Sequence, residues 1–172
     1  MKILALIVVL FLNLFFVSAS LSRTLESDLS THQVAITSSY AGKDLVFFGT
    51  REGSGNIVII LKGPDIPLIV RKKERVVGLW LNKLSVQYKG IPGYYAIASN
   101  SNLDEIFTQE FLVNQNIGLE NLSFSIEFGD TVNVNEFSSA LIKNRQKAGL
   151  FSDRLLPVEF TGEKLFRAEF QL

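Results

Sequence analysis

The feature that most limits how this chain can fold is an alternation of apolar and polar residues with a period of two. It is clearest from Leu122 to Phe128 and from Phe166 to Leu172, where every second residue is apolar. Because successive side chains of a β-strand point to opposite faces, this pattern predicts strands with one buried face. The sequence therefore predicts a mainly β fold, an immunoglobulin-like or related antiparallel β-sandwich.

Before residue 100, roughly six or seven short strands are expected, separated by turn residues. They lie at 32–37, 44–49, 56–62, 67–70, 76–82, 84–88 and 94–98. Gly53 and Gly55 predict a tight hairpin between the second and third of these strands. A run of charged residues separates the fourth from the fifth and predicts a solvated hairpin loop.

Two amphipathic helices are expected to be inserted among the strands. Apolar residues at helical spacing predict the first over 103–111, with Asn102 as its N-cap. The second is expected over about 135–150, with Phe137 and Leu141 on its buried side. Neither helix alters the expectation that strands form most of the fold.

The N-terminus predicts export. Lys2 precedes an apolar run over 3–17, and small residues lead to Ala19, which is the pattern of a signal peptide over 1–19. We expect cleavage after Ala19, with an uncleaved N-terminal anchor as the alternative. A flexible lead-in over 20–31 and a single β-sandwich domain over 32–172 follow. The chain lacks cysteine, which suits a bacterial periplasmic protein held together by packing alone.

Composition predicts a protein that is not an enzyme and needs no cofactor. The chain has one histidine and no cysteine, so it has no Cys–His pair and at most one imidazole ligand for a metal. We find no catalytic motif and no phosphate-binding glycine loop. The 17 basic and 17 acidic residues balance, so no global field attracts nucleic acid. His32 could serve as the base of a hydrolase, but the favoured interpretation is a half-buried histidine at the start of a strand.

Two groups of side chains are candidates for binding. A local cluster of four cations could dock an anion, a lipid head group or an acidic partner. Two adjacent tyrosines follow the turn at Pro92. Because adjacent strand residues face opposite ways, at least one of them could face outward, and the pair could line a cleft together with the cations. Trp80, in contrast, is expected to pack in the core. The candidate binding residues are Arg71, Lys72, Lys73, Arg75, Tyr94 and Tyr95.

Several of these residues also carry a family resemblance. The positions are His32, Val34, Ile36, Gly42, Phe48, Gly49, Gly63, Pro64, Arg71, Lys72, Lys73, Arg75, Gly78, Trp80, Asn82, Pro92, Tyr95 and Ala96. Together they resemble the alphaproteobacterial putative transmembrane protein family, from about Thr31 to the C-terminus. The most specific part is the basic run that leads to Gly78, Trp80 and Asn82.

The resemblance implies a signal peptide, an all-β extracytoplasmic region with inserted helices, and one C-terminal transmembrane helix. Genes of the family often neighbour a permease of the sulfite-exporter type, which implies an accessory role, and no catalytic residues are assigned to the family. This chain departs from the pattern because the final helix is missing, and its inward-facing pattern still runs at Leu172. An uncovered apolar edge is unusual, so either a partner covers it or the chain is truncated; we expect truncation.

The leading functional hypothesis is a non-enzymatic module in the periplasm or at the periplasmic face of the inner membrane, accessory to an inner-membrane permease. Membrane contact would come through an uncleaved leader or through the partner. The alternative is a periplasmic module that binds a small anion at the basic run and the two tyrosines. A hydrolase that uses His32 is the third hypothesis.

Overall fold

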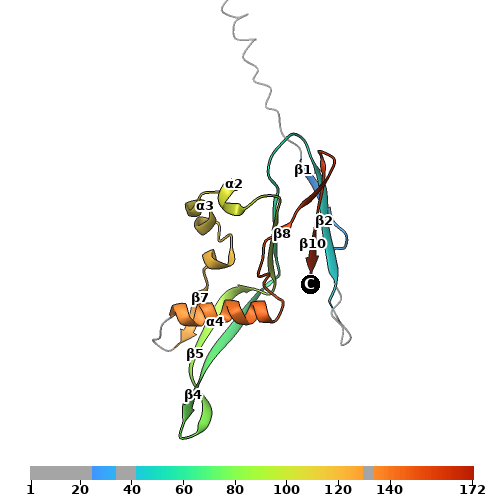
Figure 1. Cartoon of the computed structure of the whole chain (residues 1–172). Helices are drawn as coiled ribbons and strands as arrows, with labels where there is room; N and C mark the ends of the chain where they lie inside the picture. Colours follow the sequence, from blue (N-terminus) through green and yellow to red (C-terminus); the bar gives the residue numbers. More distant parts are fainter. Residues whose placement is uncertain (1–24, 34–41, 130–133) are drawn as a thin grey trace, which may run out of the picture.

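The computed structural model of the chain describes residues 25–33, 42–129 and 134–172 (Figure 1). The expected signal peptide over 1–19, its cleavage site at Ala19 and most of the expected strand at 32–37 lie outside these residues.

Strands form about half of the described residues. In chain order the elements are β1 (Leu25–Leu29), β2 (Asp44–Arg51), β3 (Val58–Lys62), β4 (Asp65–Val76), β5 (Leu79–Pro92), β6 (Tyr95–Ser99), α2 (Leu103–Ile106), α3 (Gln109–Asn114), the 3₁₀ turn η1 (Leu119–Asn121), β7 (Ser125–Gly129), α4 (Val134–Lys147), β8 (Leu156–Pro157), β9 (Glu159–Thr161) and β10 (Leu165–Gln171). The predicted mainly β architecture, with antiparallel sheets and a few short helices, is confirmed.

The described strands form three sheets. The outer sheet has the order β1-β2-β10-β9, the central sheet β3-β6-β8 and the hairpin sheet β4-β5-β7. All neighbours are antiparallel except β6 and β8, which run parallel. In Figure 1 the outer sheet lies on one side of the central sheet, and α2, α3 and the hairpin sheet lie on the other.

The central sheet separates two apolar cores. Tyr95 and Ile97 of β6 belong to the core shared with the helices and the base of the hairpin, which we call the helix-side core. Ala96 and Ala98, the alternate residues of the same strand, belong to the core beneath the outer sheet. Because successive side chains point to opposite faces, a strand with four consecutive apolar residues, Tyr95 to Ala98, can fill both cores at once.

The last strand keeps its predicted faces. Phe166, Ala168 and Phe170 are almost fully buried. β10 pairs with β2 along its whole length, and with β9 on the other side only at Leu165, Phe166 and Arg167, so only the start of the strand lies inside the sheet. Leu172 and Lys43 also exchange backbone hydrogen bonds of 2.9 and 3.1 Å.

Two expected connections are wrong. The segment with Gly53 and Gly55 does not close a hairpin, because β2 lies in the outer sheet and β3 in the central sheet. The segment at 20–31 was expected to be a flexible lead-in, yet the structure places β1 there, paired along its length with β2. In both cases a sheet partner far along the chain decides the pairing, and local turn residues carry no information about it.

The helices differ from expectation at one point. The helix expected over 103–111 is two short helices, α2 and α3, and Asn102 makes no capping bond. Thr108 instead caps α3, since its hydroxyl oxygen accepts a 3.3 Å bond from the Phe111 amide. The second helix, α4, lies where predicted and buries Phe137 and Leu141.

Candidate functional site

The β4–β5 hairpin is the most prominent projection of the described structure (Figure 1). Its base is part of the helix-side core through Val86, Tyr88 and Ile91 of β5, with Leu68 and Val70 of β4 packed against them. Beyond Val70 the strands continue away from the core to a turn at Val77 and Gly78. The sequence indicated two short strands with a charged loop at 71–75; the structure has that run inside β4 and the turn after it.

The turn holds an unusual residue. Val76 pairs with Leu79, and Val77 and Gly78 between them have φ of 49° and 85°. Positive φ at both central residues is the geometry of a type I′ turn, which matches the twist of a hairpin and favours Asn-Gly. A β-branched residue is strained in that region. The turn thus presents an apolar side chain at a cost in backbone energy, and Val77 is 98% exposed.

The residues around this turn form an exposed apolar surface, which we call the apolar tip. Trp80, the single tryptophan of the chain, and Leu79 are each 67% exposed. The prediction that Trp80 packs in the core is therefore wrong, because β5 carries it beyond the elements that form the core. The members of the apolar tip are Val76, Val77, Leu79, Trp80 and Leu81.

Behind the tip, the predicted basic run divides between the two faces of the hairpin. Arg71, Lys73 and Arg75 alternate along one exposed face, which we call the basic row. Arg75 pairs with Trp80 across the strands, so the row meets the tip. Within the described part of the chain, no carboxylate forms a salt bridge with any of the three.

Lys72 lies on the opposite face, toward α4. Its ammonium lies 2.7 Å from the carboxylate of Glu136, the first acidic residue of α4. This hydrogen bond, together with the charge of Glu136, raises the pKa of Lys72 above its ordinary value. Lys83 on β5 likewise lies 3.0 Å from Glu74. Cations on this face are therefore partly neutralised, whereas those of the basic row are available.

The two candidate tyrosines lie away from the basic row. Tyr95 is part of the helix-side core, and Tyr94 packs against the core beneath the outer sheet. Tyr95 is 1% exposed; its hydroxyl accepts a 3.0 Å bond from the Gly118 amide and donates a 3.4 Å bond to the Asn116 carbonyl. Burial raises the pKa of Tyr95, and the bond from Gly118 opposes that shift. Tyr94 is half-buried and donates a 2.8 Å bond to the Gln171 carbonyl of β10. The structure thus does not bring the six candidate residues together.

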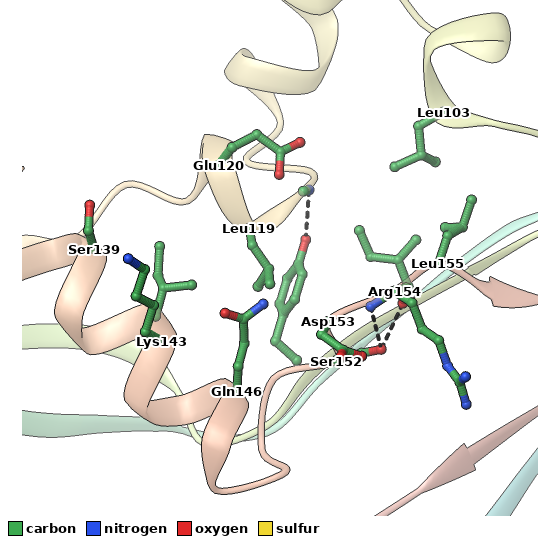
Figure 2. Close-up of a pocket in the computed structure, with 14 residues that line it drawn as sticks. Leu103, Leu119, Glu120, Ser139, Lys143, Gln146, Ser152, Asp153, Arg154 and Leu155 are labelled. Carbon is green, nitrogen blue, oxygen red and sulfur yellow. Dashed lines mark hydrogen bonds between the residues drawn. The ribbon is translucent and has the colours of Figure 1, made fainter.

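A cavity of about 460 Å³ lies next to Tyr95 (Figure 2). Glu120 reaches it from η1, Lys143 from α4, and Ser152 from the segment after α4. The Ser152 hydroxyl is engaged with the backbone of Arg154, donating to its carbonyl at 2.7 Å. The walls are mixed in charge, and the same hydroxyl also accepts a 3.4 Å bond from the Arg154 amide.

His32 is exposed, so the favoured interpretation of a half-buried histidine at the start of a strand is wrong, and it has a carboxylate partner that the sequence did not indicate. Its Nε2 lies 3.0 Å from Asp28 Oδ1, and both side chains are well exposed. The hydroxyl of the adjacent Thr31 donates to the Gln33 carbonyl at 3.0 Å. Among the described residues, no cluster of three His, Cys, Asp or Glu side chains is arranged to bind a metal.

Sequence reasoning missed the apolar tip, although a signal was present. Val76, Val77, Leu79, Trp80 and Leu81 surround Gly78 without the polar residues typical of a surface turn. An apolar turn next to a basic run is uncommon on a protein surface. The sequence pattern does not show whether other elements pack against this turn, and that packing decides whether its apolar residues are buried.

Comparison with known proteins identifies a family. The family model described as "Putative transmembrane protein (Alph_Pro_TM)" matches residues 24–172. No curated protein and no solved structure matches the chain. Within the described residues, the helices are all too short or too polar to traverse a bilayer.

Proposed function

We propose that this chain, which belongs to the alphaproteobacterial putative transmembrane protein family, is a non-enzymatic accessory module of an inner-membrane permease. It is exported and acts in the periplasm or at the periplasmic face of the inner membrane. The observation that carries the proposal is the β4–β5 hairpin, whose apolar tip and basic row project away from both cores.

Exposed contiguous apolar residues on a folded protein usually mark a place of interaction. In this hairpin they lie at the end of an antiparallel ribbon that the helix-side core anchors at its base. A base packed in the core and an exposed end suit a module that extends from its own body to a neighbouring structure. The basic row adds an electrostatic attraction to a surface rich in acidic groups.

The test is crosslinked affinity capture of the tagged full chain from its native membranes, read by mass spectrometry. We expect an integral membrane permease to be enriched, and the N-terminal peptide to begin at Ser20 if the leader is removed. Trp80→Ser should reduce the enrichment, since it removes the largest apolar side chain of the tip. Leu165→Thr, at an exposed leucine of β10, is the matched control and should leave it unchanged.

Two outcomes would contradict the proposal. In the first, the chain is recovered with no membrane protein. In the second, the permease is captured equally well by both variants, so that the hairpin has no part in placing the chain beside the permease.

A second candidate function is the binding of a small anion by the basic row. Arg71, Lys73 and Arg75 repel one another along a single strand face, and an oxyanion between them would relieve that repulsion. A ligand that binds only the folded state raises the melting temperature. Thermal shift measurements with sulfite, sulfate, phosphate and small sulfonates therefore test it, with Arg71→Gln/Lys73→Gln as the control variant. An unchanged melting temperature across the panel would count against this function.

A further inference from the structure

We propose that the apolar tip of the β4–β5 hairpin inserts into the interface of a lipid bilayer that contains anionic lipids, with the basic row meeting the phosphate groups. The inference rests on the proposed function only in placing the chain beside a membrane. It assigns lipid, and not the permease, as the surface that the tip contacts.

The distribution of apolar side chains favours lipid over a protein groove. In an antiparallel pair, opposite residues share a face, so Trp80 lies on the face of Arg75, and Leu79 lies with Val76 on the other. Val77 stands at the end between them, 98% exposed. The tip is therefore apolar on both faces and at its end. A protein groove requires one apolar face, whereas the acyl region of a bilayer surrounds an inserted segment on all sides.

The charged residues around the tip are mostly basic, which suits contact with a surface of anionic lipids. Residues 71–83 contain five basic residues and one acidic residue, Glu74. Cations flank the tip on both faces, although Lys72 and Lys83 are paired with carboxylates. Clusters of Lys and Arg next to an inserted apolar segment bind anionic head groups. Trp80 adjoins Arg75, and tryptophan favours the interface between acyl chains and head groups.

The spacing along β4 sets the depth of insertion. An antiparallel strand rises about 3.4 Å per residue, so Arg75 lies about 7 Å from the end of an upright hairpin, Lys73 about 14 Å and Arg71 about 20 Å. Interfacial segments insert about 5–10 Å. Arg75 would then reach the phosphate plane with Val77 among the acyl chains. Lys73 would lie within about one screening length of that plane, and Arg71 beyond it.

The strain at Val77 supports the same assignment. Asparagine at this position would satisfy the type I′ turn at lower backbone cost. A strained, fully exposed, apolar side chain has no stabilising role in the folded chain, and such outliers point to function. Insertion would remove this side chain from water, which is the benefit that an exposed asparagine could not provide.

The experiment uses the emission of Trp80, which reports on the tip alone because the chain has no other tryptophan. The purified full chain is mixed with vesicles of phosphatidylcholine or of phosphatidylcholine with phosphatidylglycerol. We expect a blue shift with the anionic vesicles, quenching by acyl chains brominated near the glycerol end, and weaker binding as salt increases. If another apolar segment of the chain bound the vesicles instead, Trp80 would stay in water and its emission would not be quenched.

Variants test the two parts of the surface separately. Arg75→Gln should weaken the partition into anionic vesicles roughly fivefold, Lys73→Gln by less and Arg71→Gln by least. Leu79→Thr should reduce the quenching, whereas Leu165→Thr, an equally simple change at an exposed strand leucine elsewhere, should not. Melting temperatures of all variants establish that each is folded.

The inference would be overturned if Trp80 kept the emission of a water-exposed residue with anionic vesicles while the permease was still captured. It would also be overturned if the blue shift required added permease, which would assign the tip to a protein groove, or if vesicles without anionic lipid gave equal quenching. Quenching by anionic vesicles with no permease captured would support the inference and contradict the accessory function.

Discussion

At the scale of single residues, the structure separates side chains that stabilise the fold from side chains that do not. Val77 and Tyr95 are the extremes. Val77 is almost fully exposed in a left-handed conformation that suits it poorly, whereas Tyr95 is buried with both of its hydrogen-bonding partners on the backbone. Replacing Val77 should therefore stabilise the fold, whereas replacing Tyr95 should destabilise it.

Val77→Asn should raise the free energy of unfolding by about 1 kcal/mol, because asparagine tolerates the left-handed region and valine does not. Urea unfolding followed by far-UV circular dichroism measures the change. The same variant should insert less well into vesicles. A variant that is less stable than the parent would show that Val77 makes contacts of value to the fold. Val113→Asn, at an exposed valine of α3, is a control without the strained turn.

Tyr95→Phe should lower the free energy of unfolding by about 1–3 kcal/mol, because the buried Gly118 amide loses its acceptor. Tyr94→Phe is the matched control, since the Tyr94 hydroxyl donates to a carbonyl in an exposed position. Equal losses in the two variants would contradict the role assigned to the Gly118 bond.

The raised pKa of Tyr95 also predicts a pH dependence. Burial holds the phenol neutral in the folded chain, while the unfolded chain ionises near the ordinary value of 10.0. The unfolded state then binds fewer protons, so this contribution to stability is complete below pH 10 and decreases as pH rises through the folded pKa. Urea titrations at alkaline pH should show a steeper loss for the parent than for Tyr95→Phe. Parallel curves would contradict this expectation.

At the scale of elements, close approach decides whether β1 stays on the outer sheet. A Cβ on Gly49 of β2 would lie 2.3 Å from the Glu26 carbonyl oxygen and 2.9 Å from Ser27 Cα. Both are backbone atoms of β1, so no side-chain rotation can relieve the overlap. Glycine at this position is therefore a requirement of the packing between neighbouring strands and not of a turn.

Gly49→Ala should displace β1 and destabilise the outer sheet by about 1–3 kcal/mol, the usual cost of overpacking. Hydrogen exchange should show loss of protection in Leu25–Leu29 before the rest of the sheet. Gly55→Ala is the control, because a Cβ at Gly55 would meet no atom within 4 Å. Unchanged protection of β1 would mean that the strand can shift without loss of pairing.

Helix α4 illustrates how far local sequence determines an element. Its apolar residues have helical spacing, and Gly149 after it has φ of 71°. The Leu150 amide bonds to the Arg145 carbonyl and the Gly149 amide to the Gln146 carbonyl, which is the Schellman arrangement. These signals are all within a few residues of one another, and the element was predicted correctly. The helix expected at 103–111 was not, because Thr108 caps a new helix inside it.

At the scale of the whole molecule, the central sheet joins the two cores, since β6 contributes to both. Phe137→Ala removes a buried ring from the helix-side core, and Phe166→Ala removes one from the core beneath the outer sheet. Each should cost about 3–5 kcal/mol. Because the cores share a strand, both variants should lower one common unfolding transition in calorimetry. Two separated transitions would show that the cores unfold independently. Phe128→Ala, at an exposed phenylalanine of β7, is the control.

What the sequence by itself determined was the inward face of β10 and α4. It did not determine that of β7, where alternation predicted a buried face but Ile126 and Phe128 are exposed, because no other described element covers them. Alternation placed Phe166, Ala168 and Phe170 inward, and helical spacing placed Phe137 and Leu141 inward, because these periods follow from backbone geometry alone. The pairing of strands was decided only by the tertiary structure. β2 joins β10 and not β3, and the start of β10 also pairs with β9, since partners far along the chain compete for each strand edge.

The tertiary structure also decided which apolar residues stay in water. Trp80 and Tyr95 are both aromatic residues in strands, yet one is exposed and the other buried. The difference lies in what faces them: helices and the central sheet cover Tyr95, while β5 carries Trp80 past the end of the core. Residue type determines how strongly a side chain avoids water, but only the arrangement of the other elements determines whether it can.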